Sequence, residues 1–167
     1  MIARATYWAA LAVGMSWLAA CATTARSSDN LVKPPDGIEA SGSFTPTGAP
    51  PQPPVKIEVG KSCLVDLKQS YSISGTLSGI MMIDYRILVY GPCGVPPGTF
   101  DEDWIAHGTF TGTANGSAVS GKLSYVAKVQ AGGNVEGRIS LGQGLRGELQ
   151  VRGNFSDGSL AYTGWAR

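Results

Sequence analysis

The side chains best suited to chemistry lie in the segment 101–107. Asp101, Glu102 and Asp103 are consecutive carboxylates, and His107 is the only histidine of the chain. Carboxylate oxygens bind hard cations, and a histidine can transfer a proton near neutral pH. In a strand, however, alternation would send the Glu102 side chain away from its two acidic neighbours. We therefore interpret the acidic run as the solvated start of a strand, and His107 as a surface residue.

The cysteines show no catalytic or metal-binding pattern. A nucleophilic thiol needs a nearby base, and no motif links His107 to Cys63 or Cys93. A metal site would need Cys and His residues clustered at ligand spacing, which the sequence lacks. The sequence thus predicts no catalytic residue, no metal and no other cofactor.

Residues 1–20 have the form of a bacterial secretion signal. Arg4 gives a positive start, residues 7–18 are an apolar run, and small residues follow. The run is shorter than the roughly 20 residues of a membrane-spanning helix. Its end, Leu18-Ala19-Ala20-Cys21, resembles the lipobox of bacterial lipoproteins, in which the cysteine is lipidated and becomes the first mature residue. An ordinary secretory signal cut elsewhere is the alternative.

The lipobox resemblance implies a location and a membrane partner. Ala22 follows the cysteine, and the absence of aspartate there favours the outer membrane in Gram-negative lipoproteins. Acyl chains such as palmitate anchor a protein because each buried methylene contributes about 0.8 kcal/mol. With Cys21 lipidated, Cys63 and Cys93 remain as a pair, and export from the cytoplasm implies a disulfide between them.

Charge argues against a nucleic-acid partner. Removing Arg4 with the leader lowers the 13 Lys and Arg residues to 12, equal to the 12 Asp and Glu residues. Binding to phosphates needs concentrated positive charge, and no Lys/Arg cluster exists. The sequence leaves the oligomeric state open.

The mature chain divides into a linker and one domain. Residues 21–54 are rich in Ser, Thr and Gly and contain seven of the ten prolines, so they predict a lipid-anchored, disordered, Pro-rich linker. From residue 55 to 167 apolar side chains recur at every second position, which is typical of strands. We expect the apolar face to include Leu123, Tyr125, Ile139 and Val151, and the polar face to include Lys122, Lys128, Arg138 and Arg152.

The strand pattern predicts an all-β domain. The run 71–89 is too long for one strand and is expected to break near Gly75 or Gly79, and Asn115-Gly116 predicts a two-residue hairpin turn. About eight strands joined by hairpins fit a small antiparallel barrel, because closure removes exposed edges. A β-sandwich is the alternative.

Glycine-rich β motifs carry a family resemblance over about residues 70–167. The segments 75–79, 108–112, 120–123, 142–147 and 162–164 resemble an uncharacterised bacterial family with an allene-oxide-cyclase-like, or dirigent-like, barrel. The resemblance implies an eight-stranded barrel around an apolar cavity. The catalytic residues of plant cyclases have no counterparts that can be placed in this sequence one by one.

Large side chains on the apolar face are the candidates for a ligand cavity: Met81, Tyr85, Trp104, Phe110 and Tyr125. Barrels of this size either fill their interior or hold one small ligand, and glycines on the inward face favour free volume. The first functional hypothesis is a non-enzymatic outer-membrane lipoprotein that binds a small apolar ligand or an envelope partner. The alternatives are an isomerase or cyclase of the allene-oxide-cyclase type, and an inhibitor or adhesin-like module using the loop 91–98.

Replacement of Cys21 by serine should abolish anchoring, because serine has no thiol to lipidate. Wild-type cells fed labelled palmitate should incorporate label into this protein, and cells producing Cys21→Ser should not. Incorporation at an unchanged level in the variant would show that the lipobox assignment is wrong.

Overall fold

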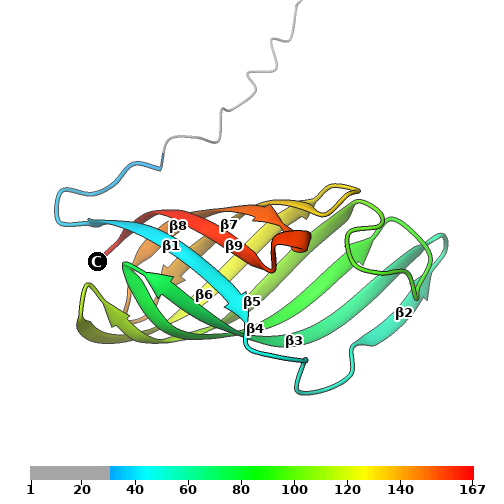
Figure 1. Cartoon of the computed structure of the whole chain (residues 1–167), viewed down its shortest axis with the longest axis horizontal. Helices are drawn as coiled ribbons and strands as arrows, with labels where there is room; N and C mark the ends of the chain where they lie inside the picture. Colours follow the sequence, from blue (N-terminus) through cyan, green and yellow to red (C-terminus); the bar gives the residue numbers. More distant parts are fainter. Residues whose placement is uncertain (1–30) are drawn as a thin grey trace, which may run out of the picture.

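The computed structural model describes residues 31–167, which form one antiparallel sheet of nine strands (Figure 1). The strands are β1 (Ile38–Pro46), β2 (Val55–Val59), β3 (Ser62–Gly75), β4 (Leu77–Val89), β5 (Glu102–Ala114), β6 (Ser117–Val129), β7 (Asn134–Gly142), β8 (Gly147–Asn154) and β9 (Ser159–Ala166). Between β8 and β9 lies a short 3-10 turn, η1 (Phe155–Asp157). Within residues 31–167, no helix has the length and apolar character needed to cross a membrane.

The sheet closes into a barrel because β1 pairs on both of its edges. Residues 38–44 of β1 pair with β9, and residues 42–46 pair with β3. The eight strands β1 and β3 to β9 therefore form a closed ring, and β2 is an extra strand on the outer edge of β3. The expected all-β barrel is confirmed, and the sandwich alternative is wrong.

The boundary expected between linker and domain is wrong, because residues 38–46 belong to the barrel. The strand shows the same alternation as the others, with Ala40 and Phe44 buried. Phe44 packs edge-on against Tyr71 of β3, with ring centroids 5.4 Å apart. The Ser, Thr, Gly and Pro content of residues 21–54 concealed this short periodic stretch. Only part of the predicted linker, residues 31–37 and 47–54, lies outside strands in the described chain.

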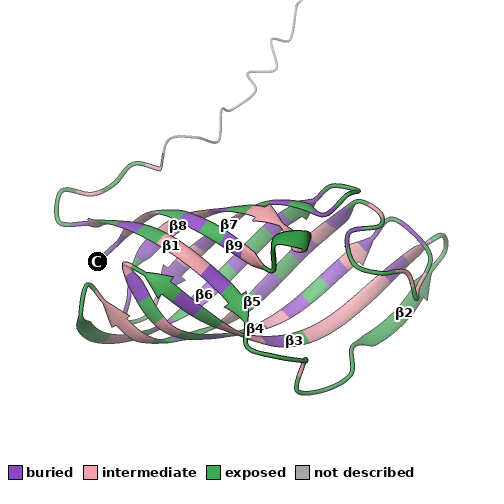
Figure 2. Cartoon of the chain, viewed as in Figure 1, coloured by how far each residue is buried: buried purple, intermediate pink, exposed green. Residues whose placement is uncertain are grey.

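Alternation along the strands separates an apolar interior from a polar exterior, as the purple and green bands of Figure 2 show. The four predicted interior residues, Leu123, Tyr125, Ile139 and Val151, are buried, at most 4% exposed. The four predicted exterior residues, Lys122, Lys128, Arg138 and Arg152, are exposed. The predicted register is therefore confirmed.

One end of the barrel is closed by glycines and a tyrosine. Gly75, at φ +111°, ends β3, which confirms the predicted break, and a Cβ there would overlap the Ser41 carbonyl oxygen. A Cβ at Gly79 would likewise overlap a carbonyl of β5. The Tyr162 hydroxyl accepts a hydrogen bond from the Leu77 N–H at 3.0 Å. The glycines therefore allow backbones to approach closely and do not leave free volume, contrary to expectation.

The hairpin between β5 and β6 lies at the same end. Asn115 and Gly116 both have positive φ, 49° and 84°, as a two-residue turn of this type requires. This turn is confirmed.

The opposite end of the barrel is open because β1 is short. Its ladder with β3 ends at Pro46, which has no N–H, and a last bond joins the Thr47 N–H to the Ser70 carbonyl. Beyond this point, over residues 62–70, β3 stays paired with β4 on one edge, but no ring strand lies along the edge that β1 occupied. The strand β2 pairs with residues 62–66 instead and extends past the barrel on the side far from the C-terminus (Figure 1).

Truncation of Tyr125 should destabilise the barrel far more than truncation of its neighbour on the outer face. Tyr125 is 0% exposed, so Tyr125→Ala should cost about 3 to 5 kcal/mol of unfolding free energy. The control Lys122→Ala, on the same strand but exposed, should cost less than about 0.5 kcal/mol. Urea denaturation measures both values, and a reversed order would contradict the register.

Candidate functional site

A cavity of about 340 Å³ lies at the open end of the barrel. Its walls come from β3 and β4, from the start of β5, from η1, and from the loop 90–101 that joins β4 to β5. The lining side chains are mostly apolar: Val65, Leu67, Tyr71, Tyr85, Ile87, Val89, Val95, Pro96, Pro97, Trp104 and Phe155. The cavity lies beyond the end of β1. Over this length neither β1 nor β9 is paired with β3, so the ring is not closed there.

Aromatic rings form the inner wall of this cavity. Tyr85 and Trp104 pack edge-on with centroids 5.4 Å apart, and the Trp104 and Phe155 centroids are also 5.4 Å apart. Tyr71 packs edge-on against Tyr85 at 6.3 Å. The contacts of Tyr85 with Tyr71 and Trp104 are edge-to-face, a favourable arrangement of aromatic pairs, whereas Trp104 and Phe155 are tilted at 37°.

Glu102 is a buried carboxylate at the edge of the cavity, and its predicted solvation is wrong. It is 3% exposed and lines the cavity beside Trp104. Its Oε1 accepts the Gly98 N–H at 2.7 Å, and its Oε2 accepts the Trp104 Nε1–H at 2.7 Å. These short bonds offset part of the cost of burying the charge. The interior of the barrel therefore holds an ionisable group at this end.

The signal that could have identified Glu102 was strand parity. Residues 102, 104, 106 and 110 of β5 all point inward, and the glutamate shares this face with three apolar residues. The alternation that separates Glu102 from Asp101 and Asp103 already placed it on the face of Trp104, but the whole acidic run was interpreted as solvated because of its charge. These two aspartates do lie on the outer side, where Asp101 is exposed and Asp103 accepts a hydrogen bond from Tyr90 at 2.6 Å.

The tyrosine hydroxyls of the interior remain protonated. Burial raises the pKa of Tyr85 well above its usual value, and nearby Tyr71 adds to the shift. Burial also raises the pKa values of Tyr71 and Tyr125. The Tyr85 hydroxyl donates to the Tyr71 hydroxyl at 3.0 Å. The cavity therefore offers neutral hydroxyls, and Glu102 is the acidic residue in its lining.

The loop 90–101 covers one side of the cavity, and several contacts hold it in place. A disulfide joins Cys93 of the loop to Cys63 at the start of β3, which confirms the predicted pair. The Gly98 N–H donates to Glu102, and Asp101 accepts the Ala131 N–H from the turn between β6 and β7. These contacts fix Val95, Pro96 and Pro97 against the barrel, where they line the cavity.

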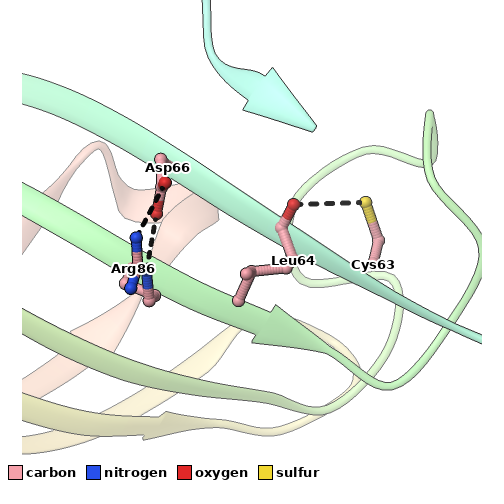
Figure 3. Close-up of polar contacts among 4 residues, drawn as sticks. All are labelled: Cys63, Leu64, Asp66 and Arg86. Carbon is pink, nitrogen blue, oxygen red and sulfur yellow. Dashed lines mark hydrogen bonds and ion pairs between the residues drawn. The ribbon is translucent and has the colours of Figure 1, made fainter. Parts of the chain in front are cut away.

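Outside the cavity, an ion pair spans β3 and β4. The Arg86 Nε and Nη2 atoms donate to the two carboxylate oxygens of Asp66 at 2.9 and 3.1 Å (Figure 3). The hydrogen bonds from Arg86 lower the pKa of Asp66. Because both side chains are solvent-exposed, the pair specifies strand register more than it adds stability.

The sequence candidates for the cavity fall into two groups. Tyr85 and Trp104 line the cavity at the open end. Met81, Phe110 and Tyr125 are buried in the barrel, at most 1% exposed, and are not part of the cavity lining. His107 is exposed on the outer face of β5, as expected, and Cys21 lies outside the described residues.

A wider groove of about 500 Å³ runs over the outer faces of β5 to β8. Its floor includes Ile105 and Val126, which are 67% and 53% exposed, and charged side chains flank it. Water reaches this surface freely, whereas a small-molecule site typically encloses most of its ligand. The end cavity, with its convergent aromatic rings and buried carboxylate, is therefore the better candidate.

Comparison with known proteins gives no family assignment. No protein-family model matches the chain, and no curated protein matches it either. The class of protein is therefore defined here by its architecture, a closed eight-stranded antiparallel barrel with one extra strand and a cavity at one end.

Loss of the disulfide should destabilise the protein through its unfolded state. The cysteines are 30 positions apart, for which chain entropy predicts a contribution of roughly 3 to 4 kcal/mol. The double variant Cys63→Ser/Cys93→Ser should lose about this much in urea denaturation. Dithiothreitol should destabilise the wild type and leave the double variant unaffected, and equal stability of the two oxidised proteins would contradict this assignment.

Proposed function

We propose that this protein is a lipid-anchored binding protein of the bacterial cell envelope whose barrel holds one small, mainly apolar ligand. The cavity at the open end carries the proposal. Its volume of about 340 Å³ falls within the range of small-molecule sites, roughly 300 to 1,000 Å³. Its lining combines many apolar side chains with few polar groups, the composition that such sites typically have.

The location in the envelope rests on two separate observations. The segment ending at Cys21 resembles a lipobox, and the Cys63–Cys93 disulfide is of the kind that persists outside the reducing cytoplasm. We infer attachment to the outer membrane from Ala22 after the lipidated cysteine. The allene-oxide-cyclase-like resemblance supports a ligand-holding barrel in this setting.

One observation favours an enzymatic alternative. Glu102 is a buried carboxylate at the cavity, and a cyclase or isomerase could use such a group as a general acid or base. No catalytic residue of the plant cyclases, however, can be placed in this sequence, and each oxygen of Glu102 accepts one N–H of the protein. Ligand binding needs no further reactive group, so we favour a binding function.

The loop 90–101 serves the cavity in this proposal. Residues 91–98 within it are the alternative candidate for an inhibitory or adhesive surface, but Val95, Pro96 and Pro97 contribute to the cavity wall. We therefore assign this loop to the ligand site.

Filling the cavity should abolish binding of an uncharged apolar probe. Val65 is half-buried at the cavity wall, so Val65→Trp places an indole in the free volume. Titration with the fluorophore N-phenyl-1-naphthylamine should show saturable binding to wild type, weakened at least about tenfold in this variant, equivalent to about 1.4 kcal/mol.

The matched control places the same ring in the outer groove. Val126 is 53% exposed there, so Val126→Trp should leave probe affinity within about twofold of wild type. Circular dichroism should show that both variants are folded. Loss of binding in Val126→Trp alone would assign the probe to the outer groove, and absence of saturable binding to wild type would refute the proposed function.

A further inference from the structure

The buried carboxylate of Glu102 has no cationic partner among residues 31–167. Four ion pairs of this part of the chain, for example, involve other acidic groups, at Asp36, Asp66, Asp84 and Asp103. Lys56 lines the rim of the cavity from the exposed strand β2 and makes no ion pair with Glu102. Removing a carboxylate from water is costly unless opposite charge or hydrogen bonds compensate it.

Hydrogen bonding satisfies Glu102 only in part. Each of its oxygens accepts one N–H, from Gly98 and from the Trp104 indole. An ionised carboxylate has about four acceptor positions, so roughly two remain. Both oxygens act as acceptors at 2.7 Å, a length typical of charge-assisted bonds. The remaining positions suit a donor that enters the cavity from solvent.

The rings that line the same cavity suit a positive charge. The faces of Trp, Tyr and Phe carry negative electrostatic potential and attract ammonium groups, most strongly where water is excluded. Trp104 donates its indole N–H to Glu102, which places the aromatic wall directly beside the carboxylate. Tyr71, Tyr85 and Phe155 extend this wall. An anionic group placed beside Glu102 would be repelled by its charge, because Lys56, the cation in the lining, makes no ion pair with Glu102.

We propose that the ligand is an organic amine, with its ammonium group beside Glu102 and an apolar body along the wall formed by β3 and β4. This inference rests on the proposed binding function and narrows it to one ligand class. The apolar residues Val65, Leu67, Ile87 and Val89 surround the body of the ligand. Glu102 makes the site specific for an ammonium group, because it is the acidic residue that lines the cavity.

Three probes of one shape test the inference by calorimetric titration: 3-phenylpropylamine, 3-phenylpropanol and 3-phenylpropionate. They share an aromatic body and differ in a terminal cation, neutral hydroxyl or anion. The wild type should bind the amine about 10- to 100-fold more tightly than the alcohol, the range expected for a charged hydrogen bond. It should bind the propionate most weakly. This comparison needs no variant, so it stands even if substitution of Glu102 impairs folding.

Two isosteric substitutions at adjacent residues test which carboxylate causes the preference for the amine over the alcohol. Glu102→Gln removes the inward charge and should reduce the preference for amine over alcohol to within about threefold, with affinity for the alcohol little changed. Asp103→Asn removes an outward charge on the same strand and should leave the preference unchanged. A preference that survives Glu102→Gln, or that is lost in Asp103→Asn, would overturn the assignment to Glu102.

The binding measurements distinguish failure of the amine proposal from failure of the proposed binding function. Equal affinity of the wild type for amine and alcohol, together with N-phenyl-1-naphthylamine binding that Val65→Trp blocks, would refute the amine and leave the cavity as a binding site. Absence of binding by all of these probes would refute both.

Discussion

The two-sided pairing of β1 determines the shape of this protein. Its hydrogen bonds to β9 and β3 join the ends of the sheet, so the ring has no free edge over that length. The pairing with β3 ends at Pro46, and beyond it the edge of β3 that faces away from β4 is paired only with β2, along residues 62–66. A longer β1 would extend the closed ring over the position of the cavity. One strand thus determines both the stability of the barrel and the location of its open volume.

The closed end of the barrel is packed tightly, whereas the open end leaves free volume, because different residue types lie at the two ends. At the closed end glycines let neighbouring backbones touch, and Tyr162 fills the remaining space with a hydroxyl that binds backbone groups of Leu77 and Ser74. At the open end large rings meet edge-on and leave space between them. Glu102 is tolerated there because the loop 90–101 and Trp104 each supply an N–H donor. Any change that displaces this loop would therefore leave a buried charge less well compensated.

Much of the fold could be predicted from the sequence because apolar and polar side chains alternate along each strand. A shift of one residue would move every apolar side chain of a strand to the solvent face, so the pattern allows only one assignment. The interior positions of β6, β7 and β8 follow from this period of two, and the turn between β5 and β6 follows from the residue pair Asn115-Gly116. The strand β1 was missed because its composition matches that of a linker, although Ala40 and Phe44 follow the period. Local composition carries no information about a partner strand more than a hundred residues away, such as β9.

The site was less predictable than the fold for a related reason. Parity places Tyr85, Trp104 and Glu102 inside, but it does not say at which end the interior is left unfilled. That depends on where β1 stops and on how the loop 90–101 folds back, and both are properties of the assembled barrel. Inward glycines suggested free volume, but at Gly75 and Gly79 the neighbouring backbones occupy the space of the missing side chains.

The chain enters the barrel at one end, and the cavity lies at the other. Residue 38 pairs with Ala166 at the closed end, and the cavity lies at the far end of strands such as β5, which has 13 residues. At about 3.3 Å per residue and a tilt near 40°, that distance is roughly 30 Å. The N-terminal segment that leads to Cys21 therefore joins the barrel at its closed end, and the cavity opens at the opposite end. A fusion partner or label attached before residue 31 would thus join the barrel at the end that does not carry the ligand site.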